Sequence, residues 1–194
     1  MTDTLKLWRG QFGTTYHERN RFTPDDVRPV FGRILHGLTI QSVLEVGSGL
    51  GHNLMAVDAE QRTGVEPNES ARIEARDTYP LVWTIDGDAA DLPFRKDSFD
   101  LVMTCGLLIH IPPAQIQQVV EEIARVSRRY VLAIEYAAVE EEMVEYRGEK
   151  DVLWRRPFGK LFQAWTGMSL VAWDAADTHL YPGCSWWLLE KGTK

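Results

Sequence analysis

Three glycines placed directly after a short apolar segment constrain this chain more than any other feature of its sequence. Residues Ser42 to Val46 are apolar and partly β-branched, and Gly47, Gly49 and Gly51 follow at alternate positions. A short apolar run that stops at glycine is typical of a buried parallel strand. Helical residues are expected from 52 to 59. The pattern therefore predicts a strand, a tight turn and a helix, with the backbone of the turn open to a ligand.

Short apolar segments continue to alternate with helical ones along the chain. Further strands are predicted at 63–66, 81–85, 100–104 and 130–135, and helices at 69–79 and from the prolines at 112 and 113 to 126. This alternation indicates a parallel sheet with helices on both faces. Residues 170–173 and 186–190 look like two strands joined by a loop, an antiparallel finish. We expect a doubly wound, Rossmann-like α/β fold with a seven-strand mixed sheet and an antiparallel final strand.

The first forty residues are expected to form a helical cap. Residues 8–38 look helical, with Trp8, Phe12 and Tyr16 near one face, and the segment from Thr23 to Asp26 has the proline and acids of a helix start. At 194 residues the chain matches one domain. We therefore expect a single domain over 1–194, with the cap at 1–40 and the sheet core at 41–194.

Composition limits the partners of such a domain. The formal net charge of −7 disfavours polymeric nucleic acid. Two cysteines make no disulfide framework, and no Cys/His spacing suggests a metal. Residues 1–7 lack the apolar core of a signal peptide and no apolar run reaches about 18 residues, so we expect neither a signal peptide nor a membrane span. We expect a cytoplasmic monomer or homodimer whose partner is a small molecule.

The spacing of the glycines discriminates between nucleotide ligands. Gly47, Gly49 and Gly51 form GxGxG, whereas a dinucleotide fingerprint needs GxGxxG and this chain has His52 at the last position. A carboxylate at Glu45 repels phosphate and suits a ligand with an ammonium group. A diphosphate is therefore not the expected ligand.

Two more carboxylates follow predicted strands. Glu66 comes at the end of the second strand, where a carboxylate accepts hydrogen bonds from ribose hydroxyls. Asp88 follows the third strand and can accept a hydrogen bond from an adenine amino group. Taken singly, each acid is as well explained by a solvated loop; their order along the chain favours a nucleoside site.

Together these pieces resemble the class I S-adenosylmethionine-dependent methyltransferases over residues 40–135. The resemblance rests on Glu45-x-Gly-x-Gly-x-Gly, Glu66, the Asp88-Ala89 loop before Leu92-Pro93-Phe94, and Asp100-Leu101-Val102. It implies that these positions hold methionine, ribose and adenine in turn. The residues we expect at the cofactor are Trp8, Tyr16, Arg19, Asn20, Glu45, Gly47, Ser48, Gly49, Gly51, Glu66, Pro67, Asp88, Ala89, Thr104, Cys105 and Gly106.

Over nearly the whole chain the sequence is similar to the pseudaminic acid biosynthesis-associated methylases. The shared segments are Phe12-Gly13-x-x-Tyr16-x-x-Arg19-Asn20, Leu108-Ile109-His110-Ile111, Arg128-Arg129-Tyr130-Val131-Leu132, Glu135-Tyr136, Tyr146-Arg147-Gly148 and Trp186-Trp187-Leu188-Leu189-Glu190-Lys191. The chain departs from that group at Arg155-Arg156-Pro157-Phe158 and Tyr181-Pro182-Gly183. Both departures fall where an acceptor is expected, so the acceptor need not be a sialic-acid-like sugar.

The acceptor side is predicted from titratable and aromatic residues. His110 is a candidate general base because its ordinary pKa lies near neutrality, although a structural histidine fits equally well; Tyr136 and Tyr146 are the other catalytic candidates. Phe12, Leu107, Arg147, Trp154 and Arg155 are expected to bind substrate. The basic cluster at 146–156 could instead be a solvated run that balances Glu140 to Glu142, and Trp8, Phe12 and Tyr16 could simply pack the cap on the sheet.

These observations predict methyl transfer from S-adenosylmethionine to an oxygen or nitrogen of a small metabolite, a sugar-like or heterocyclic natural-product precursor, with release of S-adenosylhomocysteine and without a metal. Two alternatives stay open. A non-catalytic S-adenosylmethionine-binding protein would keep the same loops, and a nicotinamide-dependent oxidoreductase, though less favoured, would share the strand, turn and helix.

Overall fold

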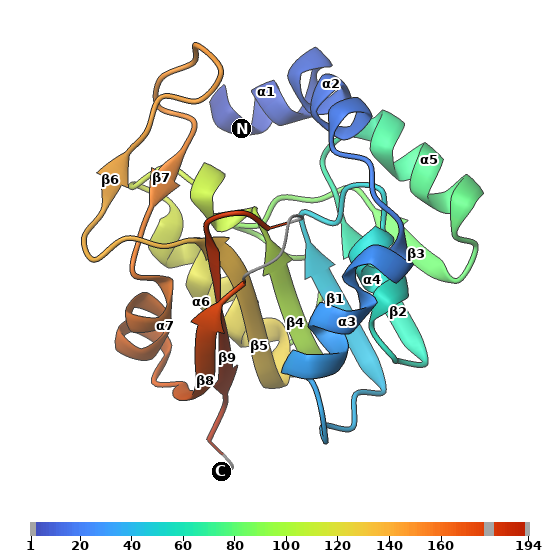
Figure 1. Ribbon diagram of the computed structural model, residues 1–194, viewed down its shortest axis with the longest axis vertical. Coiled ribbons are helices and arrows are strands. Elements are labelled where there is room, and N and C mark those ends of the chain that lie inside the picture. The colour runs from blue at the N-terminus through green and yellow to red at the C-terminus, as the bar shows by residue number, and fades with distance from the viewer. Residues whose placement is uncertain (1–2, 177–180, 193–194) are drawn as a thin grey trace.

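The alternation of apolar strands and helices produces a seven-stranded sheet in the order β3-β2-β1-β4-β5-β9-β8 (Figure 1). The computed structural model describes residues 3–176 and 181–192. The strands are β1 Ser42–Val46, β2 Gln61–Val65, β3 Val82–Ile85, β4 Phe99–Cys105, β5 Ser127–Tyr136, β8 Ser169–Ala175 and β9 Cys184–Glu190. The first five are parallel, and β9 runs antiparallel to both β5 and β8. The mixed sheet and its antiparallel final strand are as predicted.

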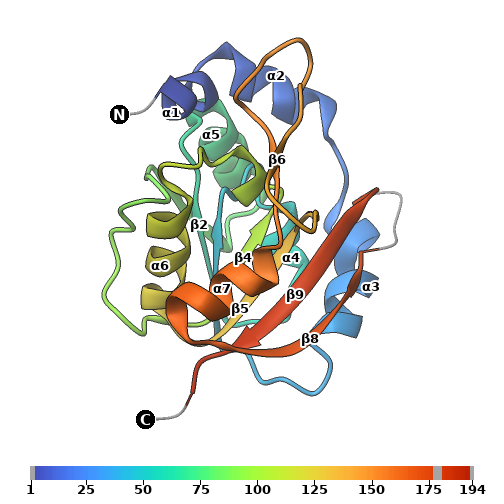
Figure 2. The same cartoon turned by 90° about the vertical axis from the view of Figure 1, so that its left-hand side faces the viewer.

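Helices cover both faces of this sheet (Figure 2). On one face α3 Pro24–Ile34 and α4 His52–Ala56 bury Val27, Phe31 and Leu54. On the other face α6 Ile116–Val126 and α7 Phe158–Thr166 bury Ile123 and Phe158. Because apolar layers lie on both sides, every residue of β1 is buried. α5 Glu69–Thr78 connects β2 to β3.

The N-terminal cap is three helices rather than one continuous helical stretch. α1 Asp3–Arg9 and α2 Gln11–Arg19 are separated by Gly10, whose extended backbone interrupts the helix. The predicted start at Pro24 is confirmed for α3, where the Asp26 carboxylate accepts a 2.7 Å hydrogen bond from the Thr23 N–H. α1 and α2 lie across the carboxyl edge of the parallel strands (Figure 1).

Several elements were not predicted. α1 begins before residue 8, where the helical stretch was expected to start. α7 was not expected either, although Phe158, Leu161 and Phe162 have the spacing of one helix face, and Phe158 and Phe162 are buried in the core. A two-stranded ribbon, β6 Glu142–Met143 and β7 Trp154–Arg155, and the short 3-10 helix η1 Leu108–His110 were also missed. α6 begins at residue 116 and not at the prolines, because residues 112–115 form a turn that precedes it.

The longest helices in the described residues, α3 and α6, have 11 residues each. Within that part of the chain no helix is both long and apolar enough to cross a membrane. Nor do three or more His, Cys, Asp or Glu side chains gather there in an arrangement that could hold a metal ion.

Candidate functional site

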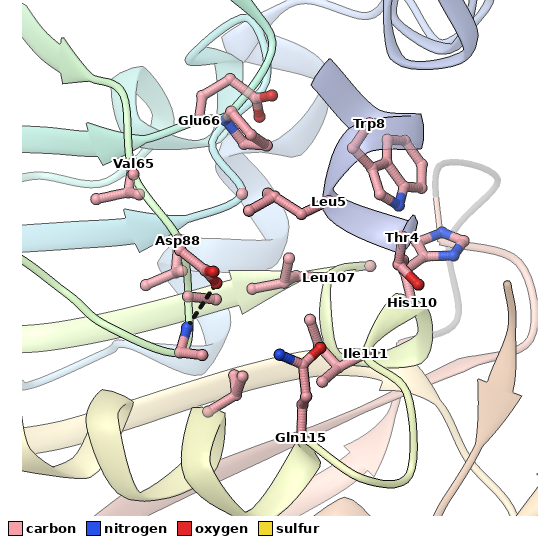
Figure 3. Close-up of a pocket in the computed structure, with 18 of the residues that line it drawn as sticks. Thr4, Leu5, Trp8, Val65, Glu66, Asp88, Leu107, His110, Ile111 and Gln115 are labelled. Atoms are coloured by element: carbon pink, nitrogen blue, oxygen red, sulfur yellow. Dashed lines mark hydrogen bonds between the residues drawn. The ribbon is translucent and has the colours of Figure 1, made fainter. Parts of the chain in front are cut away.

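A cavity lies at the carboxyl edge of the parallel strands, beneath α1 and α2 (Figure 3). The ends of β1 and β2 form its walls, the end of β4 and the loop after it form its floor, and the loop after β3 closes one end. Parallel strands end on the same edge, so segments far apart in the sequence meet here. This is the edge at which open α/β sheets bind their ligands.

The glycine turn after β1 forms part of the wall. Gly47, Gly49 and Gly51 have φ of +75°, +50° and +79°, in the left-handed region that favours glycine. A Cβ at Gly47 would stand 3.0 Å from a methyl carbon of Leu107, which lines the same cavity. The amides of Gly47 and Ser48 donate to the Val65 carbonyl oxygen at 2.8 and 3.1 Å, so the turn is fixed to the end of β2.

Glu66 lies immediately after β2 and is held by backbone donors. Its Oε2 accepts a 2.9 Å hydrogen bond from the Gly49 amide, and its Oε1 accepts one of 2.8 Å from the Asn68 amide. The residue is only 4% exposed, yet it lines the cavity. Each oxygen therefore has a fixed position and lone pairs that remain for hydroxyl donors.

Glu45, within β1, is buried behind the glycine turn. Its Oε1 accepts a 2.7 Å hydrogen bond from Asn53, and the Tyr181 hydroxyl in turn donates to the Asn53 side-chain oxygen at 2.7 Å. Its Oε2 is buried and has no hydrogen-bond partner among the described residues. Burial raises the pKa of the Glu45 carboxyl to about 8. A cation close to this carboxyl would relieve the cost of charging it.

The loop after β3 brings Asp88 into the lining of the cavity (Figure 3). One oxygen of its carboxylate accepts a 2.9 Å hydrogen bond from the Ala90 amide, which orients the side chain. Gln115, the residue before α6, also lines the cavity and is drawn near Leu107 and Ile111 in Figure 3. Asp88 therefore offers hydrogen-bond acceptors to a bound ligand, and the Gln115 side-chain amide offers both a donor and an acceptor.

The floor of the cavity is the segment after β4, from Cys105 to Leu107. Gly106 has a φ of +69°, and nothing lies within 4 Å of the position of a Cβ there. The buried carboxylate of Glu135 accepts hydrogen bonds from the amides of Leu107 and Leu108 at 3.2 and 3.1 Å. Burial raises the pKa of Glu135 to about 7. Glu135 therefore shapes the floor and does not line the cavity.

His110, at the end of η1, lines the cavity beside Trp8, with ring centroids 4.6 Å apart. Its Nδ1 lies 2.6 Å from the Val152 carbonyl oxygen. A carbonyl only accepts, so Nδ1 carries the hydrogen and Nε2 is an acceptor. Burial lowers the pKa of His110 to about 4, so the ring is neutral at physiological pH. It can accept a hydrogen bond from a bound hydroxyl or amine.

The roof consists of side chains from α1 and α2. Trp8 and Tyr16 both line the cavity, and their ring centroids are 5.2 Å apart. Phe12 packs edge-on against Trp8 at 5.3 Å but does not line the cavity. Asn68 holds this roof, because its side-chain amide lies 3.1 Å from the Trp8 carbonyl oxygen and 3.2 Å from the Gly10 carbonyl oxygen.

The structure brings many of the predicted site residues together and leaves others apart. Those that line the cavity are Trp8, Tyr16, Gly47, Glu66, Pro67, Asp88, Ala89, Cys105, Gly106, Leu107 and His110. Glu45, Ser48, Gly49 and Thr104 lie next to that lining but are not part of it. Gly51 lies away from the lining, where a Cβ would face Val82 and Tyr79. Arg19 and Asn20 are exposed at the end of α2, and the Asn20 amide bonds the Tyr16 carbonyl oxygen.

Of the predicted acceptor residues, His110 and Leu107 line the cavity, and the others do not. Tyr146 is 5.6 Å from His110 between ring centroids, and Tyr136 ends β5. Arg147 is exposed in the loop of the ribbon, and Arg155 is exposed on β7, with Glu142 3.5 Å away. Trp154, also on β7, is buried.

Half of the lining was not predicted. Thr4 and Leu5 were missed because no helix was expected before residue 8, and His17 because the face of α2 could not be fixed. Val46, Val65 and Gly87 immediately precede predicted ligands and could have been found from the strand ends alone. The rest are Ala90, Ile111, Pro112, Gln115 and Val119.

The charge of the lining discriminates between ligands. Glu66 and Asp88 are its acids, and the described residues that line the cavity include neither lysine nor arginine. A diphosphate needs such cations or a row of free backbone amides. The cavity instead suits hydroxyl, amino and ammonium groups.

The chain is similar to known proteins in sequence over part of its length. Residues 43–129 match the model of a family described as methyltransferase domain. A curated relative, a probable S-adenosylmethionine-dependent methyltransferase of Mycobacterium tuberculosis, is 33% identical over 101 residues, which make up 51% of this chain and 36% of the relative. The chain therefore spans little more than a third of that relative.

Solved structures are similar over a larger share of the chain. The magnesium protoporphyrin IX methyltransferase of Synechocystis, solved with bound S-adenosylhomocysteine, has a TM-score of 0.70 at 14% identity and covers 95% of each chain. The phosphoethanolamine N-methyltransferase 1 of Haemonchus contortus has a TM-score of 0.74 at 16% identity, over 98% of this chain and 50% of that one. The fold is thus the Rossmann-like fold of methyltransferases, as predicted.

Proposed function

We propose that this chain is an S-adenosylmethionine-dependent methyltransferase that methylates an oxygen or nitrogen of a small metabolite. The observation that carries the proposal is a cavity in which the glycine turn, Glu66 and Asp88 meet, and whose described lining holds no lysine or arginine. The family match over residues 43–129 supports the same chemistry. A nicotinamide dinucleotide, with its diphosphate, fits these charges poorly.

The residues present fit an adenosyl amino acid. The unpaired Oε2 of Glu45 is a buried acceptor next to the turn, suited to an ammonium group directly or through water. Gly47 and Gly106 leave the backbone bare at the same end. In the proposed complex these residues hold the methionine moiety, Glu66 accepts from the ribose hydroxyls and Asp88 from the adenine amino group.

When bound, the cofactor supplies a methyl group on a positively charged sulfur. The protein's part is to hold the acceptor in line with that methyl group and to exclude water. Trp8 offers an aromatic face, which attracts a cation by about 1 kcal/mol. His110 accepts a hydrogen bond from the acceptor O–H or N–H at Nε2, and the Val152 carbonyl fixes the tautomer that makes this possible.

The acceptor-binding residues and the narrower grouping belong to the same proposal. Tyr146 stands near His110, and Tyr136 ends β5. Arg147, Trp154 and Arg155 belong to the ribbon, where they would meet a sugar-like or heterocyclic acceptor. The motifs shared with the pseudaminic acid-associated methylases support such a substrate. We further treat 1–194 as one cytoplasmic domain, active as a monomer or homodimer.

Calorimetric titration with S-adenosylhomocysteine tests the cofactor assignment. We expect saturable binding to the wild type, and at least a tenfold loss of affinity in Asp88→Ala, because one hydrogen bond to a charged acceptor is worth about 1.5–3 kcal/mol. NAD serves as the comparison ligand. Binding of NAD in place of S-adenosylhomocysteine would contradict the proposal.

Turnover needs a second measurement. Labelled S-adenosylmethionine is incubated with the protein and a metabolite extract, and methylated products are identified by mass spectrometry. We expect a labelled small molecule together with S-adenosylhomocysteine. Tight cofactor binding without any labelled product, across extracts of different origin, would favour a non-catalytic binding protein.

A further inference from the structure

His17 lies in the roof of the cavity, directly above the glycine turn. A Cβ at Gly49 would stand 3.0 Å from His17 Cε1, so the imidazole packs on the bare backbone of that glycine. His17 Nε2 is 3.8 Å from Glu66 Oε1. The nitrogen is buried and has no hydrogen-bond partner among the described residues. A polar atom in this state is expected to have a ligand.

The inner face of α2 fixes the position of this ring. Gly13, Thr14 and His17 share one face, because residues three and four apart are neighbours on a helix. A Cβ at Gly13 would stand 2.0 Å from the Trp8 carbonyl oxygen, so the two helices of the roof touch through bare backbone. The Asn68 amide reaches the Thr14 hydroxyl at 3.2 Å. The imidazole is therefore held over Glu66 by packing and by a hydrogen bond.

Glu66, Gly49 and His17 form one unit. The Gly49 amide donates to Oε2 of Glu66, and His17 covers Gly49 and faces Oε1 of the same carboxylate. A separation of 3.8 Å is too long for a direct hydrogen bond between Nε2 and Oε1. One hydroxyl oxygen can nevertheless lie about 2.8 Å from both atoms.

We propose that His17 is a further ligand of the nucleoside and shares a ribose hydroxyl with Glu66; this inference rests on the proposed function. The carboxylate accepts the hydroxyl hydrogen, and the imidazole, with its hydrogen on Nε2, donates to the hydroxyl oxygen. A carboxylate alone takes any donor, including an amine. A group that donates to Glu66 and accepts from His17 at the same point is a hydroxyl, so the pair selects a ribose.

A cycle of protein and ligand changes tests the assignment by calorimetry. The variants are His17→Phe and His17→Asn, and the ligands are S-adenosylhomocysteine and its 2′-deoxy and 3′-deoxy analogues. We expect His17→Phe to bind S-adenosylhomocysteine 5- to 10-fold more weakly than the wild type does, about one hydrogen bond. For the analogue that lacks the shared hydroxyl, wild type and His17→Phe should differ by less than about twofold.

Controls separate binding from folding. His36→Phe changes an exposed histidine that does not line the cavity, and it should bind all three ligands as the wild type does. His17→Asn keeps an N–H donor, so it should bind S-adenosylhomocysteine more tightly than His17→Phe does. If His17→Phe does not fold, His17→Asn is compared with the wild type in its place. Circular dichroism and thermal melting confirm that each variant is native.

Two outcomes would overturn the inference about His17 while leaving the proposed function intact. An equal loss with all three ligands would mean that His17 only packs the roof. Unchanged or tighter binding of S-adenosylhomocysteine by His17→Phe would mean that the imidazole contributes nothing or obstructs the site. Failure of the wild type to bind S-adenosylhomocysteine is a different result, because it overturns the proposed function itself and His17 with it.

Discussion

Substitution of Glu45 by glutamine should change how the stability of this protein depends on pH. The carboxyl is buried within β1, and burial raises its pKa to about 8. In the unfolded chain the pKa of a glutamate is about 4.3. Between these two values the folded state binds a proton that the unfolded state has lost. The free energy of unfolding must therefore fall as the pH rises through this window.

The size of the effect follows from the two pKa values. Each pH unit inside the window costs about 1.4 kcal/mol. From pH 5 to pH 8 the contribution of Glu45 falls by about 3.5 kcal/mol, somewhat less than three pH units at the full slope would give, because the folded carboxyl is already half ionised at pH 8. Glutamine cannot ionise, so Glu45→Gln lacks this loss. The variant should gain about 3.5 kcal/mol relative to the wild type over that interval.

Urea unfolding at pH 5, 6.5 and 8 measures this difference, with the fluorescence of the seven tryptophans as the signal. Glu135 and His110 also have shifted pKa values, but they titrate in both proteins and cancel in the comparison. Glu60→Gln is the matched control because Glu60 is exposed. The difference in the free energy of unfolding between Glu60→Gln and the wild type should not change with pH.

If the difference in the free energy of unfolding between Glu45→Gln and the wild type did not change with pH, the claim that burial raises the pKa of this carboxyl would be refuted. A difference of the opposite sign would mean that a positive group holds Glu45 charged in the free protein. Saturating S-adenosylhomocysteine adds a link to function. If its ammonium group lies at Glu45, the bound protein favours the charged carboxylate, and the pH dependence of the difference should shrink.

Two further predictions concern the acceptor side. His110→Ala should lower kcat by about 10²- to 10³-fold, because Nε2 is proposed to act on the acceptor, and it should change the affinity for S-adenosylhomocysteine by less than about threefold. Steady-state kinetics measure kcat and calorimetry measures the affinity. An unchanged kcat would contradict the proposed role of His110. Arg156→Ala should lower the free energy of unfolding by about 3 kcal/mol, because the guanidinium is 1% exposed and bonds Glu141 and the Leu108 carbonyl oxygen. Arg155→Ala changes an exposed neighbour and should alter the free energy of unfolding by less than about 0.5 kcal/mol. Urea unfolding measures both variants. Equal losses of stability in the two would contradict the stabilising role given to the buried Arg156.

The sheet and one wall of the cavity could be predicted from the sequence for a simple reason. A parallel strand is a short apolar run, and its carboxyl end is marked by the residue at which the run stops. Gly47, Glu66 and Asp88 each follow such a run, so the topology alone brings them to one edge. At these residues the end of a strand, which the sequence marks, is also the place where the folded chain meets the cavity.

The roof could not be predicted in the same way. Which face of α2 turns inward depends on packing between Gly13 and the Trp8 carbonyl, a contact that no periodicity reveals. With His17 facing the cavity, a residue two positions later points about 200° away around the helix. Arg19 was expected at the cofactor and is exposed for this reason. Gly10 separates α1 from α2, so the helical spacing that starts at Trp8 could not be extended across it to assign the inner face of α2.

The ribbon of β6 and β7 shows how burial divides neighbours that the sequence treats alike. Arg155 and Arg156 look like one basic pair, but Arg155 ends β7 and Arg156 continues the extended chain into a bridge with Ala137, and adjacent residues of an extended chain point to opposite sides. Arg155 is exposed beside Glu142, whereas Arg156 is buried and donates to the Leu108 carbonyl oxygen at 3.1 Å. The segment that ends at Arg156 also supplies the Val152 carbonyl that orients His110. Changes in this segment can therefore re-orient His110 while the glycine turn stays fixed. In the proposed enzyme this would separate the choice of acceptor from the binding of the cofactor.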